Sequence, residues 1–175
     1  MDWTAYEPFD PGIWGPLHEQ SAADAKGAFD RLMAAKEERK LALSHLLKAN
    51  GIELAPTDEA IQRVNDWFRR EVEPDPRDPT RLRPLWYAVV NDLALYLGDV
   101  IVSRNPGVAW IIVTRPEDDV SFQRHVLTGF TKVPNPRYKI DIDMLIGTYG
   151  QRVIAGLSVE PDEFVRILNA AASKA

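Results

Sequence analysis

The chain has 175 residues, of which 45% are hydrophobic and 27% are charged. This length is about one domain and this composition is typical of folded proteins, which disfavours disorder of the whole chain. The net charge of −5 disfavours a general nucleic-acid binder, and the lack of cysteine excludes disulfides, thiolate metal sites and cysteine nucleophiles.

The first segment, residues 1–17, combines aromatic residues with prolines: Trp3, Tyr6, Phe9 and Trp14 occur with Pro8, Pro11 and Pro16. Because prolines prevent a continuous helix, we expect an extended arm whose aromatic side chains pack on the domain. The alternative is that Trp3 and Trp14 dock on a second copy of the chain, as in a structural homo-oligomer. The arm has acidic but no basic residues, unlike a signal peptide, and no apolar run reaches the roughly 20 residues of a membrane span. We therefore predict a cytoplasmic protein that does not bind membranes.

Two amphipathic helices are expected after the arm. Ser21 can cap the first, which apolar residues at helical spacing extend to Asn50, although the charged run 36–40 interrupts their stripe. Thr57 can cap the second helix, which ends before the proline-rich segment 73–84. We predict that this segment is a loop crossing between elements.

The middle of the chain predicts a buried helix followed by strands. Pro84 suits the first turn of a helix over residues 85–97, which is apolar on nearly all sides, and Gly98 is expected to end it. The hydrophobic patterns then predict strands and helices further along the chain. The strands are expected over 99–104, 108–114, 124–131 and 138–143, and the helices over 144–155 and from residue 161 onward.

This order of elements indicates an α+β fold in one domain, residues 1–175. It comprises N-terminal helices, a central buried helix leading into a mostly antiparallel sheet of three to four strands, and C-terminal helices. Short connections between the strands favour the antiparallel pairing. One face of the sheet is expected to pack on the buried helix, and the other is a candidate binding surface.

One histidine has carboxylates within reach of its predicted strand. Asp141 and Asp143 share a face of the predicted strand 138–143, so pairing with the strand of His125 would bring the three together. A histidine with two carboxylates can transfer protons or bind a metal. A small metal-dependent or acid–base hydrolase using His125 with Asp141 or Asp143 is therefore one hypothesis. The opposing interpretation is a solvated strand face without a catalytic role.

The motifs that identify cofactor sites are missing from the sequence. It contains no phosphate-binding glycine loop, no dinucleotide fingerprint and no G-x-S-x-G serine elbow, so we predict no cofactor. The acidic loop 117–119 lacks the alternating ligands and central glycine of a helix–loop–helix calcium site. We therefore interpret that loop as a polar turn and predict no metal site.

The acidic residues favour a protein partner as the leading hypothesis. With no catalytic motif and a negative net charge, the chain is expected to be a non-enzymatic binding domain whose partner has a basic surface. The expected contact residues are Glu117, Asp118, Asp119, Asp141 and Asp143.

Residues 85–113 resemble part of a group of small, uncharacterised bacterial α+β domains. The stretch LALYLGDVIVSRNPGVAWIIV carries the resemblance, through Leu97, Gly98, Asp99 and Trp110. In those domains a helix ends in a Leu-Gly-acidic step, enters a strand and returns on a strand bearing tryptophan. Some toxin-immunity and contact-system accessory proteins are similar in this stretch. The resemblance implies a bacterial immunity-like or accessory protein, and it implies no catalytic residues.

Overall fold

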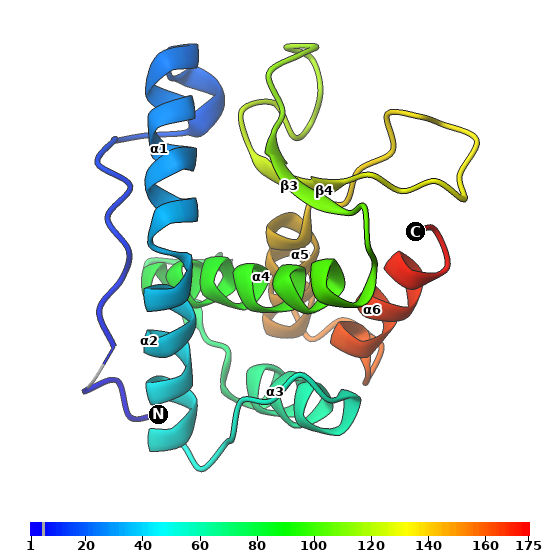
Figure 1. Cartoon of the computed structure of the whole chain (residues 1–175). Helices are drawn as coiled ribbons and strands as arrows, with labels where there is room; N and C mark the ends of the chain where they lie inside the picture. Colours follow the sequence, from blue (N-terminus) through cyan, green and yellow to red (C-terminus); the bar gives the residue numbers. More distant parts are fainter. Residues whose placement is uncertain (5) are drawn as a thin grey trace.

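The structure is a computed structural model that describes residues 1–4 and 6–175. Over these residues it contains six α-helices and two separate two-stranded antiparallel sheets (Figure 1). The α+β class is therefore confirmed, but the single sheet of three to four strands is not formed. The helices are α1 (Ala22–Ala34), α2 (Lys36–Ala49), α3 (Asp58–Glu71), α4 (Pro84–Arg104), α5 (Ile142–Ile154) and α6 (Glu163–Ala172). The strands are β1 (Pro74–Asp75), β2 (Asp78–Leu82), β3 (Ala109–Ile112) and β4 (His125–Thr128).

The first predicted helix is divided into α1 and α2 at Ala35. Ser21 caps α1 as expected, because its side chain accepts a hydrogen bond from the amide of Asp24. Ala35 has φ −84° and ψ −1°, and it serves as the last residue of one helix and the first of the next. Thr57 caps α3 in the predicted way, accepting from the amide of Ala60.

The prediction that Gly98 ends the central helix is wrong. Helix α4 begins at Pro84 as expected and continues through Gly98 to Arg104, so residues 99–104 are helical rather than a strand. The buried residues Leu97, Val100 and Ile101 continue the helical spacing of the core. The glycine is needed for packing: a Cβ atom at position 98 would overlap the indole ring of Trp110.

The larger predicted sheet is reduced to the pair β3–β4. These strands run antiparallel, with Trp110 opposite Leu127 and Ile112 opposite His125. Their positions confirm the predicted strands 108–114 and 124–131 within shorter bounds. The predicted strand 138–143 contributes only one bridge, between Leu127 and Ile140. The pairing does not continue beyond Ile140 because helix α5 starts at Ile142.

The prediction that the proline-rich segment 73–84 is a loop is wrong, because the segment forms a small hairpin between α3 and α4. Strands β1 and β2 pair across a tight turn, with a register irregularity between Pro74 and Asp75. The amide of Arg83 also donates to the carbonyl of Glu73, which closes the base of the hairpin. The prolines here are compatible with a two-stranded ribbon because each strand has an edge that needs no amide donor.

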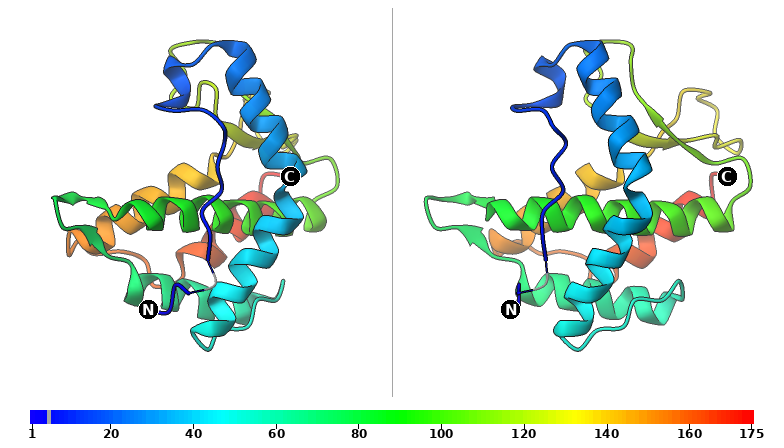
Figure 2. Two further views of the ribbon diagram at one scale, coloured as in Figure 1. Left: turned by 90° about the vertical axis from the view of Figure 1, so that its left-hand side faces the viewer. Right: turned by 60° about the vertical axis from the view of Figure 1, so that its left-hand side comes forward.

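Helix α4 is the centre of the molecule. Figure 2 shows it crossing α1 and α2 on one side, while α3, α5 and α6 surround the rest. Within the described residues it is the one helix long and apolar enough to cross a membrane, but 67% of its most apolar window is buried inside the protein. Trp86 in α4 packs against Trp67 and Phe68 of α3, with ring centroids 5.4 and 5.6 Å apart. This helix is therefore the core of the fold.

Buried charges attach α2 and the arm to α4. Arg39 binds Asp92 with two hydrogen bonds, Nε to Oδ1 at 3.0 Å and Nη2 to Oδ2 at 2.6 Å, and the hydroxyl of Tyr6 donates to the same Oδ2 at 2.6 Å. Burial raises the pKa of the Tyr6 hydroxyl, so it remains a donor. Within the charged run 36–40, Arg39 thus faces the core helix, whereas Glu37 and Glu38 are exposed.

A second ionic cluster lies further along α4, around Asp99. Lys36 and Lys40 donate to its two carboxylate oxygens at 2.7 and 2.6 Å, and the indole of Trp110 donates to Oδ1 at 3.1 Å. Burial by itself would raise the pKa of Asp99, but these three donors together lower it. This cluster connects α2, α4 and β3.

Candidate functional site

The predicted site residues Asp141 and Asp143 come together, but around an arginine. Arg124 donates to Oδ2 of Asp141 at 2.7 Å and to Oδ2 of Asp143 at 2.5 Å. Asp141 is buried and also caps α5, accepting from the amide of Met144 at 2.9 Å. Its carboxylate is therefore occupied by structural contacts, whereas Asp143 lies in the first turn of α5 and is half-buried.

The predicted acidic surface is partly neutralised. Lys139 donates to Asp119 at 2.5 Å, and this hydrogen bond, with one from the amide of Ser121, lowers the pKa of the Asp119 carboxyl. Glu117 and Asp118 are exposed, and neither forms an ion pair with any residue that the structure describes. Of the five predicted contact residues, only these two present free charge to solvent.

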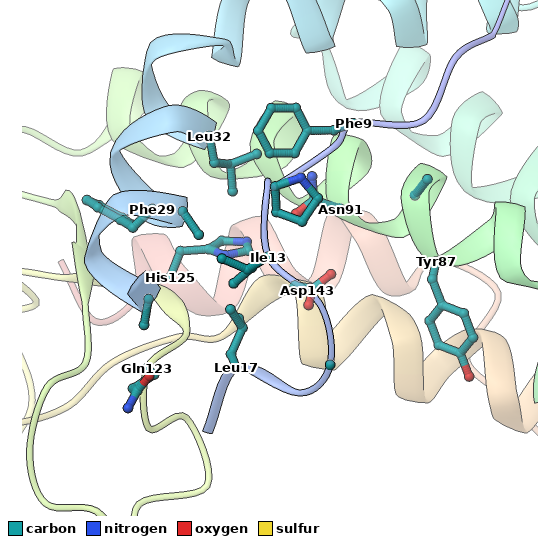
Figure 3. Close-up of a pocket in the computed structure, with 15 residues that line it drawn as sticks. Phe9, Ile13, Leu17, Phe29, Leu32, Tyr87, Asn91, Gln123, His125 and Asp143 are labelled. Atoms are coloured by element: carbon teal, nitrogen blue, oxygen red, sulfur yellow. The ribbon is translucent and has the colours of Figure 1, made fainter. Parts of the chain in front are cut away.

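A cavity of about 280 Å³ lies beneath the N-terminal arm (Figure 3). The arm forms one wall, α1 a second, α4 a third, and the segment around β4 closes the end. Most of the lining is apolar: Phe9, Pro11, Ile13, Leu17, Ala25, Ala28, Phe29 and Leu32. Four polar side chains also reach it, from Asn91, Gln123, His125 and Asp143. The cavity therefore combines an apolar interior with a small polar region.

The arm is held over this cavity by contacts near its start and in its middle. Tyr6 anchors its start through Asp92, and the guanidinium of Arg31 donates from Nε to the carbonyl of Pro11 at 2.9 Å. Trp3 packs against Trp86 at a centroid distance of 5.2 Å, so it lies on its own domain. Trp14 differs, because its side chain is turned to solvent and is 92% exposed.

His125 contributes a buried polar group to the cavity wall. It is 9% exposed, and its Nε2 atom is buried with no hydrogen-bond partner among the described residues. Figure 3 shows the imidazole projecting toward the middle of the cavity, near Ile13. Burial lowers the pKa of the ring, outweighing the opposite effect of Asp143 and Asp141. The ring is therefore neutral at pH 7, with one nitrogen able to donate and one able to accept.

Gln123 is the second buried polar group, and its backbone is unusual. Its φ of +60° is in the left-handed region, which is uncommon for a residue other than glycine. Its Nε2 donates to the carbonyl of Gln20 at 3.1 Å, which fixes the orientation of the amide. The remaining Oε1 is buried and has no donor among the residues that the structure describes. Strained backbone and unpaired polar atoms are both features that concentrate at functional sites.

The predicted hydrolase arrangement is only partly assembled. His125 and Asp143 line the same cavity, while Asp141 does not. No hydrogen bond described in the structure joins His125 to either carboxylate, and within the described residues there is no cluster of three or more metal-ligating side chains. A general base normally lies within hydrogen-bond reach of the group that orients it. The hydrolase hypothesis thus stays a prediction without that pairing.

No family model, curated protein or solved structure matches this chain. The resemblance of residues 85–113 to small bacterial domains therefore stays a prediction.

Sequence reasoning identified His125 and Asp143 but missed Gln123 and Asn91. Polar amides carry no pattern that separates a cavity wall from a surface loop. The cavity itself joins residues from the arm, α1, α4 and β4, which are distant in sequence. The one usable signal was the aromatic arm, whose predicted packing on its own domain puts Phe9 over the cavity.

The buried imidazole of His125 predicts a specific pH dependence of stability. Because burial lowers its pKa from 6.5, the folded protein is protonated at a lower pH than the unfolded chain. The free energy of unfolding should therefore fall as the pH drops below about 6.5, by at most about 1.4 kcal/mol per pH unit. Urea unfolding at pH 7 and pH 5.5 measures this loss, which should be smaller in His125→Phe. Equal losses in the two proteins would contradict the assignment to His125.

Proposed function

We propose that this protein binds a small, mostly apolar molecule in the cavity beneath the arm. The observation that carries the proposal is the pair of unpartnered buried atoms, His125 Nε2 and Gln123 Oε1, in a mostly apolar lining. A buried polar atom without a partner costs about 1–3 kcal/mol. A ligand that hydrogen-bonds to both atoms would remove that cost and gain the burial of its apolar part.

The volume of the cavity restricts the ligand to a compact molecule. A volume of about 280 Å³ corresponds to about nine water molecules at ~30 Å³ each. Ligand pockets generally range from about 300 to 1,000 Å³, so this one is at the small end. A single aromatic ring with a short side chain is of suitable size, whereas a nucleotide or a long acyl chain is not.

Filling the cavity should abolish binding while the fold is retained. Ala28 is buried on the cavity side of α1, so Ala28→Leu puts its additional carbons into the cavity. We expect 2-phenylethanol to shift the NMR signals of His125 and Gln123 in a saturable way, and the Ala28→Leu variant to bind at least about tenfold more weakly. The matched control is Ala23→Leu, an exposed position on the same helix. Equal binding by the two variants would refute the cavity as the site.

A second candidate function is the binding of a partner protein, as an immunity-like or accessory factor. The specific observation in favour is the exposure of two apolar side chains, Trp14 at 92% and Val120 at 74%. Large exposed aromatic residues are frequent anchors of protein interfaces. Glu117 and Asp118 supply free negative charge in the same loop as Val120, which suits the predicted basic partner. A bacterial, cytoplasmic protein is the setting that this candidate assumes.

The partner hypothesis makes a distinct prediction for Trp14. If this residue anchors an interface, including one with a second copy of the chain, Trp14→Ser should reduce association without changing the melting temperature by more than about 2 °C. Light scattering measures self-association, and capture from a bacterial lysate, followed by identification of the partner and titration with the purified protein, measures the hetero-complex. If both are unchanged in Trp14→Ser, the protein-binding candidate is wrong. Removing residues 1–17 would not be a clean test, because Tyr6 is part of the buried core.

A further inference from the structure

The polar atoms of the cavity define the chemistry of the ligand more closely, an inference that rests on the proposed function. We propose that the cavity selects a compact apolar molecule whose polar end is a primary ammonium group. The proposal depends on which groups line the polar end, on their net charge, and on the absence of lysine and arginine from the described residues that line the cavity.

The polar end of the cavity is rich in hydrogen-bond acceptors. Gln123 presents its carbonyl oxygen, because its amide nitrogen is already bound to the carbonyl of Gln20. Asp143 presents a carboxylate whose described hydrogen bond from Arg124 uses only Oδ2. The neutral imidazole of His125 has one nitrogen that can accept. An ammonium group has three donors, so it can pair with acceptors of each of these kinds.

The charge at this end of the cavity is negative. Among the described residues, Arg124 is the one cation paired with the carboxylates of Asp143, which lines the cavity, and of Asp141 behind it, which does not, so one positive charge faces two negative charges. The N-terminal end of α5, beside these residues, adds about half a positive charge, which leaves the group negative. No lysine or arginine occurs among the described residues that line the cavity. A cationic ligand would complete this charge balance.

A carboxylate ligand is disfavoured by the same geometry. It has no donors, so it would leave the oxygen of Gln123 unpaired and would bring a third negative charge to the polar end. A hydroxyl group is intermediate, because it can donate one hydrogen bond but carries no charge. The remainder of the ligand would contact apolar side chains of the arm and α1, including Phe9, Leu17 and Phe29.

Four probes with the same aromatic body test the proposal on the full chain. They are 2-phenylethylamine, 2-phenylethanol, propylbenzene and 3-phenylpropionate, each titrated by NMR or calorimetry at pH 7. We expect the amine to bind best, at least about tenfold more tightly than the alcohol and about a hundredfold more tightly than the carboxylate. If the carboxylate binds as tightly as the amine, or if all probes bind equally, the ammonium proposal is overturned while the cavity remains a ligand site. If none of the four binds, the proposed function itself fails.

A charge-neutralising variant tests the role of Asp143. In Asp143→Asn, we expect the affinity for 2-phenylethylamine to fall about tenfold while the affinity for 2-phenylethanol changes less than about twofold. The control is Asp58→Asn, which removes an exposed carboxylate that is also paired with an arginine, Arg104. This control should leave both affinities unchanged. Equal loss for the amine and the alcohol in Asp143→Asn, or no loss for either, would overturn the proposal.

Discussion

Replacing Asp92 with alanine is expected to lower the free energy of unfolding by about 3–5 kcal/mol, because it leaves a buried cation without its partner. Asp92 is fully buried, the side chain of Arg39 is 7% exposed, and their closest N–O distance is 2.6 Å. The same change removes the acceptor of the buried Tyr6 hydroxyl. Urea denaturation monitored by tryptophan fluorescence measures the loss.

The matched control for this pair is Asp58→Ala, which breaks an exposed ion pair with Arg104. Exposed pairs contribute about 0–1 kcal/mol, so this variant should be nearly as stable as the original protein. Replacing both buried partners, in Arg39→Met with Asp92→Leu, should recover most of the stability, since a buried pair exchanged for apolar residues of similar size is often neutral. Similar losses for Asp58→Ala and Asp92→Ala would contradict the account of the buried pair.

Loss of Asp92 should also affect the cavity. Tyr6 fixes the start of the arm through its hydrogen bond to Asp92, and residues from the 9–17 part of the arm form one wall of the cavity. At temperatures where Asp92→Ala is still folded, we therefore expect weaker ligand binding than in Asp58→Ala. The stability of the core and the shape of the proposed site are in this way connected through one carboxylate.

The second large effect is expected for Gly98→Ala. A Cβ atom at this position would lie 2.5 Å from Cη2 of Trp110 and closer still to Cζ2, so the indole would have to move. That movement would also break its hydrogen bond to Asp99. Overpacking of a core costs about 1–3 kcal/mol or more, which exceeds the ~1 kcal/mol that alanine normally gains over glycine in a helix.

Gly147 supplies the control for this prediction. It also lies within a helix, but a Cβ atom there would meet only Val90, at 3.9 Å. Gly147→Ala should therefore be neutral or stabilising by up to about 1 kcal/mol. Thermal unfolding of the two variants measures the difference. If Gly98→Ala is as stable as Gly147→Ala, the indole does not pack on the helix as described.

The behaviour of Gly98 explains why part of the fold was predictable and part was not. The helix starts at Ser21, Thr57 and Pro84 follow from local chemistry, and all three were predicted. A glycine followed by an acidic residue also resembles a local helix end. Here its role depends on Trp110, which arrives from another element, and no local pattern contains that contact. Helix α4 therefore continues where the sequence suggested a strand.

The charged run 36–40 is a second case in which local sequence does not predict a contact with a distant element. Local spacing predicts that Arg39 and Lys40 interrupt an apolar stripe, but both find carboxylates on α4. Their burial depends on Asp92 and Asp99 lying opposite, which is a tertiary relation. Likewise, the sequence predicted that paired strands would bring His125 and Asp143 together. In the structure both residues line the cavity, but Asp143 belongs to helix α5.

A crystal structure of the protein with 2-phenylethylamine tests the central claim most directly. We predict that the phenyl ring lies between the arm and α1, and that the nitrogen lies within hydrogen-bond distance of Oε1 of Gln123 and the carboxylate of Asp143. The claim would be contradicted if the arm collapsed into the cavity and left no space there, or if the amine bound only at the surface.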